Sequence, residues 1–237
     1  MTGMLASVCN VKEAQQVLDV GVDIIDLKNP LDGALGALDN ELVKEIVAFI
    51  NGVKPVSATI GNLPCKAEIL EPEIRKMALA GVDIIKIGVF DKIDGEPELE
   101  MLSRLSQEGI RIVLVIFAEH YLDNRHLDNY AKAGVIGVML DTLHKENGSL
   151  VEKLEYSTLS EFVKDGKRLK MIVGLAGSLN ETHALDLVEI DADYLGFRGG
   201  LCKHGNRSNV LDTEMAFKIR SKIATDSVKR TNLGILA

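Results

Sequence analysis

A short repeat constrains the fold of this chain more than any other feature. Residues 21–25 read Gly-Val-Asp-Ile-Ile, and residues 81–85 repeat the same sequence. Each copy follows an amphipathic segment, and weaker echoes occur at 133–141 and 190–196. A glycine followed at once by an apolar run indicates a helix that stops and a short buried strand that begins. Nearly continuous apolar strands are typical of parallel sheets that are covered on both faces.

The same alternation of strand and helix recurs along the chain. Apolar runs predict strands near residues 4–8, 23–28, 55–60, 83–88, 111–116, 136–141, 170–175 and 193–197. Amphipathic segments predict helices near 11–20, 39–51, 71–80, 96–108, 122–133, 157–166, 181–188 and 212–224. Eight such units in 237 residues are spaced by roughly 30 residues, which is typical of a (β/α)₈ barrel. We therefore predict a single-domain α/β fold, a (β/α)₈ TIM barrel over residues 1–224, with a C-terminal tail at 225–237.

A doubly wound open sheet is the alternative fold. It rarely uses so many evenly spaced units, and the Gly-rich dinucleotide-binding turn that often follows its first strand is absent here. No Pro-rich linker or low-complexity tract divides the chain, which favours one domain.

Charge and cysteine content exclude several classes of protein. The 27 basic and 35 acidic residues give a net charge of −8, which argues against nucleic-acid binding because phosphate backbones require a basic face. Three widely spaced cysteines suggest no disulfide framework. The N-terminus does not resemble a signal peptide, and no apolar run is long enough for a membrane span. We expect a cytoplasmic protein without nucleic-acid or membrane partners.

Charged residues interrupt three of the predicted strands near their ends. In a barrel, reactive groups belong at the C-terminal ends of strands and in the loops that follow. Alternation of side chains places Asp26 and Lys28 on one side of their strand and Lys86 on the corresponding side of its own. Asp141 ends the sixth predicted strand. If these side chains point inward, they meet at one mouth of the barrel.

Two lysines in apolar strands require a physical explanation. Burial disfavours the ammonium form, and a second nearby cation lowers the pKa of a lysine further. A neutral lysine amine can attack a carbonyl and form a Schiff base. Asp26 and Asp141 could keep one lysine protonated while the other acts as a base. The alternative is that each lysine forms a structural ion pair or extends to solvent at the strand end.

Glycine-rich segments after the last two strands indicate a phosphate site. Residues 174–178 read Gly-Leu-Ala-Gly-Ser, and residues 196–200 read Gly-Phe-Arg-Gly-Gly. Loops after strands seven and eight are the recurrent phosphate site of this fold, and glycines allow backbone N–H groups to approach an anion. Glycines also serve plain turns, which is the alternative here. The predicted phosphate-binding residues are Gly177, Ser178, Arg198, Gly199 and Gly200.

Three other loops contain candidate residues. The segment 28–36 is rich in turn residues and is either a mobile loop over the mouth or a plain connector. His144 and Lys145 follow the sixth strand, where they either assist proton transfer or are simply solvated. The basic segment 202–207 either binds a second anionic group or is merely exposed. The five histidines have no metal-ligand spacing, so we predict no metal.

Several separate segments resemble one known family in both order and spacing. They are residues 22–30, 32–36, 56–61, 83–88, 139–142, 174–178 and 196–200. Together they are similar to the (5-formylfuran-3-yl)methyl phosphate synthase family, also called 4-(hydroxymethyl)-2-furancarboxaldehyde-phosphate synthase. The resemblance extends from the first strand to about residue 220, and the segment from about Thr225 to Ala237 matches nothing familiar.

The resemblance implies a TIM-barrel lyase without a cofactor. Its substrate would be a small phosphorylated triose, because the family condenses two glyceraldehyde 3-phosphate molecules into a phosphorylated furan aldehyde, with loss of phosphate and water, on the route to methanofuran or its bacterial analogue. By the same resemblance, Lys28 forms the Schiff base and Lys86 is the general acid, while Asp26, Asp141 and Lys145 fall on active-site positions. His144 has no such support.

Two other functions stay open at this point. A reversible Schiff-base phosphate-sugar aldolase would use the same lysine chemistry without eliminating phosphate. A catalytically silent barrel could instead bind a phosphorylated metabolite as a sensor, although the presence of both lysines argues against it. We also expect the barrel to form a homo-oligomer, through a surface that the sequence does not identify.

Overall fold

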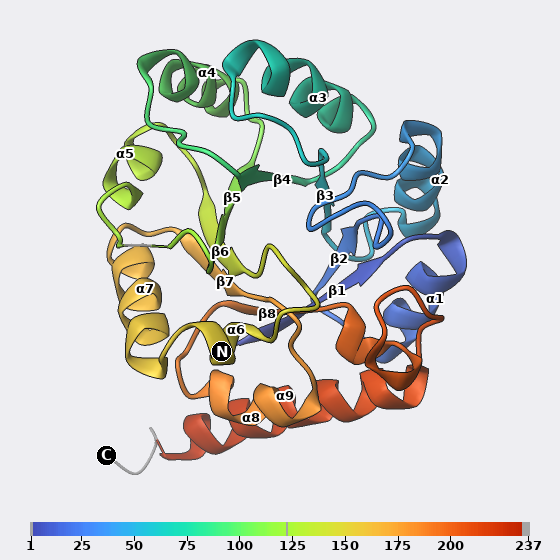
Figure 1. The fold of residues 1–237 in the computed structure, drawn as a ribbon. Coiled ribbons are helices and arrows are strands. Elements are labelled where there is room, and N and C mark those ends of the chain that lie inside the picture. The colour runs from blue at the N-terminus through green and yellow to red at the C-terminus, as the bar shows by residue number, and fades with distance from the viewer. Residues whose placement is uncertain (1, 122, 234–237) are drawn as a thin grey trace.

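Eight parallel strands form a closed barrel in sequential order, as predicted (Figure 1). The computed structural model describes residues 2–121 and 123–233, with residues 224–233 described by their backbone alone. The strands are β1 (Gly3–Val8), β2 (Ile24–Leu27), β3 (Val56–Thr59), β4 (Ile84–Val89), β5 (Ile112–Phe117), β6 (Gly137–Asp141), β7 (Ile172–Leu175) and β8 (Tyr194–Phe197). Pairing of β1 with β8 closes the sheet.

Helices surround the barrel (Figure 1). They are α1 (Val11–Val20), α2 (Asn40–Ile50), α3 (Ala67–Leu79), α4 (Glu96–Gln107), α5 (Leu127–Lys132), α6 (Leu150–Lys153), α7 (Tyr156–Arg168), α8 (Glu181–Val188) and α9 (Thr213–Leu233), with short 3₁₀ turns η1 (Gly199–Leu201) and η2 (Lys203–Gly205) in the loop after β8. Within the described ranges, none of these helices has the length and apolar character needed to cross a bilayer.

Three helix boundaries differ from those predicted. Helix α3 begins at Ala67, before the predicted start near 71, and so contains Pro72 in its interior. The segment 122–133 forms only the short helix α5, and residue 122 lies outside the described residues. Helix α9 continues to Leu233, well beyond the predicted end at 224. Residues 225–233 of the predicted tail are therefore helical, whereas 234–237 lie outside the described residues.

The glycine of the repeat ends a helix with a backbone conformation that most residues avoid. Gly21 has φ 75° and Gly81 has φ 86°, both in the left-handed region. In the echo at 190–196, Asp191 occupies the corresponding position with φ 63°. Glycine adopts this conformation without steric cost, and aspartate tolerates it better than most residues do. The repeat therefore encodes an abrupt reversal from helix to strand.

The aspartate of the repeat joins neighbouring strands at the end of the barrel where the strands begin. The Asp23 carboxylate accepts a hydrogen bond from the backbone N–H of Met4 at 2.7 Å, and Asp83 accepts one from Val56 at 2.8 Å. Asp193 accepts the equivalent bond from β7, also at 2.8 Å. Each bond satisfies a backbone donor where a strand begins. In these three places, the aspartate thus aligns a strand with the one before it.

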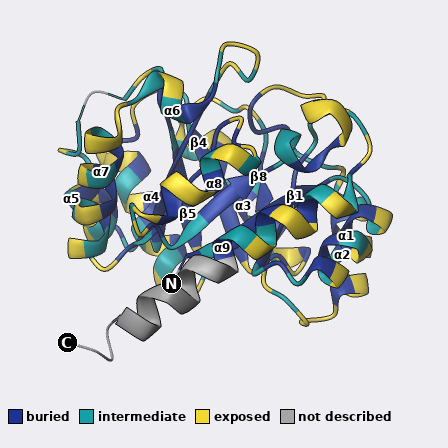
Figure 2. Ribbon diagram, turned by 90° about the horizontal axis from the view of Figure 1, so that it is seen from below, coloured by how far each residue is buried: buried dark blue, intermediate teal, exposed yellow. Residues whose placement is uncertain are grey.

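Apolar side chains form separate layers outside and inside the sheet. The outer layer packs between strands and helices, and the inner layer includes Ile24, Ile84 and Met139. Figure 2 shows buried strands within helices whose outward faces are exposed. Because side chains alternate along a strand, Asp26 and Lys86 lie on the same inner side as Ile24 and Ile84. The predicted inward direction is confirmed by the contact between their charged groups, described below.

A buried glycine allows α7 to approach β7 closely. A Cβ atom at Gly166 would lie 2.5 Å from Cγ2 of Val173, and valine has a stiff side chain that yields little. Alanine favours a helix by about 0.5–1 kcal/mol over glycine, whereas overpacking costs about 1–3 kcal/mol. We therefore expect Gly166→Ala to lower the free energy of unfolding in urea titrations. Lys164→Ala, at an exposed position of the same helix, should change it little, and a stabilised Gly166→Ala would contradict this packing argument.

Candidate active site

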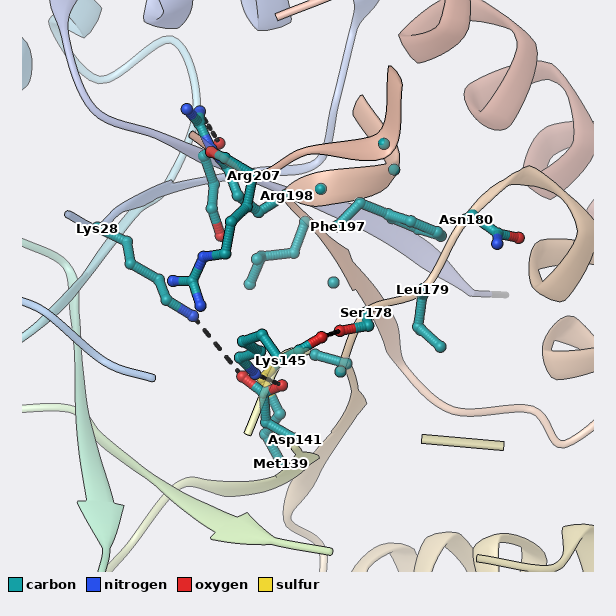
Figure 3. Close-up of a pocket in the computed structure, with 18 of the residues that line it drawn as sticks. Lys28, Met139, Asp141, Lys145, Ser178, Leu179, Asn180, Phe197, Arg198 and Arg207 are labelled. Atoms are coloured by element: carbon teal, nitrogen blue, oxygen red, sulfur yellow. Dashed lines mark hydrogen bonds and ion pairs between the residues drawn. The ribbon is translucent and has the colours of Figure 1, made fainter. Parts of the chain in front are cut away.

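A cavity of about 220 Å³ lies at the C-terminal ends of the strands (Figure 3). It is lined by nine of the ten predicted site residues, namely Lys28, Lys86, Asp141, Lys145, Gly177, Ser178, Arg198, Gly199 and Gly200. The tenth, Asp26, is completely buried and pairs with Lys86. The fold therefore brings residues from β2, β4, β6 and the later loops to one place, as the strand-end pattern predicts.

Asp26 and Lys86 form a buried ion pair. The Lys86 Nζ lies 2.8 Å from Oδ1 of Asp26. The hydroxyl of Ser57 donates to the same oxygen at 2.7 Å, and the hydroxyl of Ser7 donates to Oδ2 at 2.8 Å. Both carboxylate oxygens are thus fully engaged. A buried carboxylate with this many donors is held in one position, and it holds the Lys86 amine in turn.

The register of the sheet explains why serines surround Asp26. Ser7 of β1 is paired with Asp26 of β2, and Asp26 is paired with Ser57 of β3. Residues paired across adjacent strands point to the same side of the sheet, so both hydroxyls reach the carboxylate. The sequence analysis missed these two serines. A polar residue inside each flanking apolar strand was the available signal, but its use required the register.

Lys28 and Lys145 share the second buried carboxylate, Asp141. Lys145 donates to Oδ1 of Asp141 and, at 3.3 Å, to the hydroxyl of Thr142. The backbone N–H of Thr142 also donates to Oδ1, at 2.7 Å. Lys28 makes a longer contact, because its Nζ lies 3.7 Å from Oδ2 (Figure 3). Among the cavity's lysines, Lys28 therefore has the weakest hold on a counter-ion.

Burial and nearby charges shift the pKa values of this group. Burial lowers the pKa of Lys28 from 10.5 to about 7; Asp141 opposes this shift, while Lys145 and Lys86 add to it. Burial also lowers the pKa of Lys145, against the attraction of Asp141. For Asp141, burial alone would raise the pKa, but Lys145 and Lys28 outweigh it and lower the value to about 2. Near neutral pH, a large fraction of Lys28 is therefore the free amine beside an ionised carboxylate.

Glycines allow the loops after β6, β7 and β8 to pack backbone against backbone. A Cβ atom at Gly177 would lie 2.9 Å from the backbone nitrogen of Thr142, and one at Gly200 would lie 2.4 Å from the carbonyl oxygen of Leu179. The hydroxyl of Ser178 donates to the carbonyl of Lys145 at 3.0 Å. The glycines thus have a structural role between loops and also line the cavity, and phosphate binding by them stays a prediction.

Arg198 lines the cavity, but its guanidinium is held by other protein groups. Its Nη1 lies 2.5 Å from Oε2 of Glu13 and 3.2 Å from the carbonyl of Ser7, and its Nε donates to the carbonyl of Arg207 at 2.9 Å. A substrate phosphate would therefore have to compete with Glu13 for Arg198. The sequence analysis missed Glu13, because its pairing joins α1 to the distant loop after β8.

Arg207 is a cavity residue that the sequence analysis included only within the basic segment 202–207. It lines the main cavity together with Lys28 and Lys145. His144 instead lies at an outer cavity and pairs with exposed Glu146 at 3.9 Å. Among the described residues, no group of three or more His, Cys, Asp or Glu side chains is arranged to hold a metal ion. The cavity therefore presents amines and a guanidinium to a ligand.

The lowered pKa of Lys28 predicts a stability cost that depends on pH. The unfolded chain binds the lysine proton below about pH 10.5, whereas the folded protein binds it only below about pH 7. The free energy of unfolding should therefore decrease as the pH is lowered from about 10.5 to about 7. Below about pH 7, the destabilisation by Lys28 should be complete and no longer change with pH. We expect Lys28→Met to be more stable than the native protein by about 1–4 kcal/mol at neutral pH, with a smaller difference near pH 10.

Urea denaturation at both pH values measures this difference. Lys44→Met serves as the control, because Lys44 is an exposed lysine on α2. A stability difference for Lys28→Met that does not change with pH would contradict the assignment of a lowered pKa to Lys28.

Solved structures of other barrels are similar to this chain in fold. With 3-hexulose-6-phosphate synthase from Salmonella typhimurium the TM-score is 0.68 at 15% sequence identity, covering 94% of this chain and 99% of the other. With 3-keto-L-gulonate-6-phosphate decarboxylase from Vibrio cholerae it is 0.66 at 13% identity, covering 94% and 98%. At such low identity, these similarities establish the TIM-barrel fold alone.

Sequence comparisons are more specific. The family model described as 4-HFC-P synthase matches residues 4–220. The chain is 30% identical over 232 residues to (5-formylfuran-3-yl)methyl phosphate synthase of Archaeoglobus fulgidus, covering 93% of this chain and 98% of that protein. It is 30% identical over 229 residues to the Methanocaldococcus jannaschii protein of the same name, covering 92% and 97%. The chain with this lysine-rich cavity is therefore an enzyme of the (5-formylfuran-3-yl)methyl phosphate synthase family.

Proposed function

We propose that this enzyme condenses two molecules of glyceraldehyde 3-phosphate into (5-formylfuran-3-yl)methyl phosphate, with loss of phosphate and water, through a Schiff base on Lys28. The product would enter the synthesis of methanofuran or a related furan cofactor. One observation carries the proposal: a buried lysine whose pKa is lowered to about 7 lies in a cavity with a second, tightly paired lysine. The names of the family's members support the choice of product.

Lys28 is the proposed nucleophile. Its amine attacks the aldehyde carbon of the first triose, and loss of water gives an iminium ion. The neutral amine needed for this attack is available at neutral pH because burial and two neighbouring lysines disfavour the ammonium form. Asp141, 3.7 Å from Nζ, is placed to stabilise the positive charge of the iminium. Lys86 and Lys145 are more closely bound to their carboxylates and are therefore less suited to attack.

Lys86 is the proposed general acid. Its contact with Asp26 at 2.8 Å keeps the amine in one position, and the serine hydroxyls fix Asp26. Lys86 can therefore deliver a proton to a developing oxyanion or leaving oxygen without first reorganising its surroundings. Asp141 and Lys145 form the second charged group, which we propose assists proton transfer at the Lys28 adduct.

The iminium on Lys28 serves as an electron sink for the following steps. It eases removal of the proton from the adjacent carbon, and the resulting enamine expels the phosphate on the next carbon. The unsaturated three-carbon unit left on Lys28 then condenses with the second triose, and cyclisation with loss of water gives the furan. Aromaticity of the furan makes the final step effectively irreversible. The second triose keeps its phosphate, which the loops containing Gly177, Ser178, Gly199 and Gly200 are proposed to bind.

Incubation with glyceraldehyde 3-phosphate alone tests this function. We expect a furan aldehyde with new near-ultraviolet absorption, free inorganic phosphate and, after borohydride reduction, a covalent adduct on Lys28, all measured by spectroscopy and mass spectrometry. Lys86→Ala should lower kcat by about 10²–10⁴-fold, and Lys28→Ala should lower it further because the covalent route disappears.

Lys44→Ala, which removes an exposed lysine, is the matched control and should leave the rate unchanged. An adduct without phosphate release or furan would favour a Schiff-base aldolase instead. Absence of any substrate-dependent adduct would rule out the lysine mechanism and favour a phosphate-binding sensor.

The rate should depend on pH through Lys28. Only the free amine attacks, and protonation increases as the pH falls below the pKa of about 7. We therefore expect kcat/KM to reach a plateau above neutral pH and to fall about tenfold per pH unit well below it. Asp141, with a pKa of about 2, stays ionised throughout this range and adds no inflection. Steady-state assays between about pH 5.5 and 8.5 measure this profile, and a flat profile would exclude a lysine with this pKa as the nucleophile.

A further inference from the structure

One cation of the main cavity differs from the others in its partners. The cavity is lined by Lys28, Lys86, Lys145, Arg198 and Arg207. The first four each lie within ion-pair distance of a buried carboxylate, from Asp141, Asp26 or Glu13. Among the described residues, no carboxylate lies within that distance of Arg207. Within the described ranges, Arg207 is therefore a half-buried guanidinium at the cavity without a carboxylate at ion-pair distance.

The hydrogen bonds of Arg207 are also incomplete. Its Nη2 donates to the carbonyl of Gly33 at 3.1 Å, but its Nε is buried and has no hydrogen-bond partner in the described part of the chain. Burial lowers the pKa of this guanidinium, although Asp141 and other charges partly oppose the shift. A buried N–H without a partner costs free energy, and a ligand that accepts its hydrogen bond recovers that cost.

Two hydrogen bonds position Arg207 at the cavity mouth. Its backbone carbonyl accepts the Nε hydrogen bond of Arg198, which Glu13 holds in turn. Its side chain reaches across to Gly33 in the loop after β2. Figure 3 shows the guanidinium pointing into the cavity from the loop after β8. The position is therefore set by main-chain and charged contacts, as expected for a residue that recognises a ligand in a fixed place.

A second cavity adjoins the main one at Arg207. It lies between the loops after β2, β6 and β8, and it shares Lys145, Gly205 and Arg207 with the main cavity. Arg207 is thus at the boundary between the enclosed lysines and the outer mouth. An anion released beside Lys28 would meet this guanidinium on its way out.

We propose that Arg207 binds the phosphate group that is expelled from the triose held on Lys28, and that it guides the released phosphate into the outer cavity. The proposal rests on the proposed function and assigns this residue a step in it. A guanidinium suits a phosphate monoester because its planar fork donates two parallel hydrogen bonds. The glycine loops after β7 and β8 are then left to hold the phosphate that the product retains.

The assigned step is balanced without any further reactant. In the enamine on Lys28, the nitrogen lone pair re-forms the carbon–nitrogen double bond. The π electrons of the enamine carbon–carbon double bond then form a new double bond between the middle and terminal carbons. The bond from the terminal carbon to the phosphate oxygen breaks, and its electrons go to that oxygen. One proton has been lost from the middle carbon, and the departing group gains one, so hydrogen phosphate leaves. Arg207 stabilises the negative charge that develops on the phosphate oxygen.

Borohydride trapping with intact-protein mass spectrometry tests this assignment, because it distinguishes two adducts on Lys28. In Arg207→Gln we expect kcat to fall by about 10²-fold, phosphate release to slow as much as furan formation, and the adduct that still carries phosphate to accumulate. Arg207→Lys should restore part of the rate, because it keeps the charge but loses the fork. Lys203→Gln removes an exposed cation from the same loop, outside both cavities, and should behave like the native enzyme.

Other results would overturn the proposal. Accumulation of the phosphate-free adduct would assign Arg207 to the second triose, and unchanged rates would leave it a structural residue only. Circular dichroism shows whether each variant is folded. If Arg207→Gln does not fold, Arg207→Lys provides the test.

If the native enzyme itself forms neither adduct nor furan, the proposed function fails. Calorimetric titration with inorganic phosphate then tests the site directly, and equal affinity in the native protein and Arg207→Gln would refute an anion site at this residue.

Discussion

Burial, together with a shortage of negative charge in the cavity, sets the pKa of Lys28. Among the described residues, three lysine amines line the cavity, and they share two carboxylates at ion-pair distance, Asp26 and Asp141. Asp26 is engaged by Lys86 and two hydroxyls, and Asp141 is held most closely by Lys145 and the adjacent backbone. Lys28 is left with the longest contact to a counter-ion, while like charges and burial act against its ammonium form. The result is an amine with a lowered pKa, without any chemical change to the lysine itself.

The closed sheet makes this arrangement possible. In a barrel, alternate strands direct side chains into the same interior layer, so β2, β4 and β6 bring charged groups together although they are far apart in sequence. The repeated aspartates, at the end of the barrel where the strands begin, hold the register of neighbouring strands. Slippage by one residue would turn Asp26 and Lys86 toward the helices. The same hydrogen bonds that stabilise the barrel therefore also position the charged groups at the C-terminal ends of the strands.

The loops add a second level of organisation. Glycines let the loops after β6, β7 and β8 approach one another more closely than any side chain would allow. Arg198, which the sequence suggested as a phosphate ligand, lines the cavity and also connects α1 to the loop after β8 through Glu13. This buried pair supports the backbone from which Arg207 extends. One arginine thus holds the loop, and the other points into the cavity.

The sequence by itself determined the barrel, its eight units and the residues at the strand ends, because apolar periodicity and glycine stops are local properties of the chain. It also identified Lys28, Lys86 and their carboxylates, since charges inside apolar strands are conspicuous in any sequence. Only the tertiary structure decided which lysine pairs with which carboxylate, and hence that Lys28 has the longest contact to its counter-ion. It likewise showed that Arg198 is paired with Glu13, whereas Arg207 has no carboxylate at ion-pair distance among the described residues. Ion pairs and hydrogen bonds between distant segments depend on register and loop packing, and these physical relationships have no local signature in the chain.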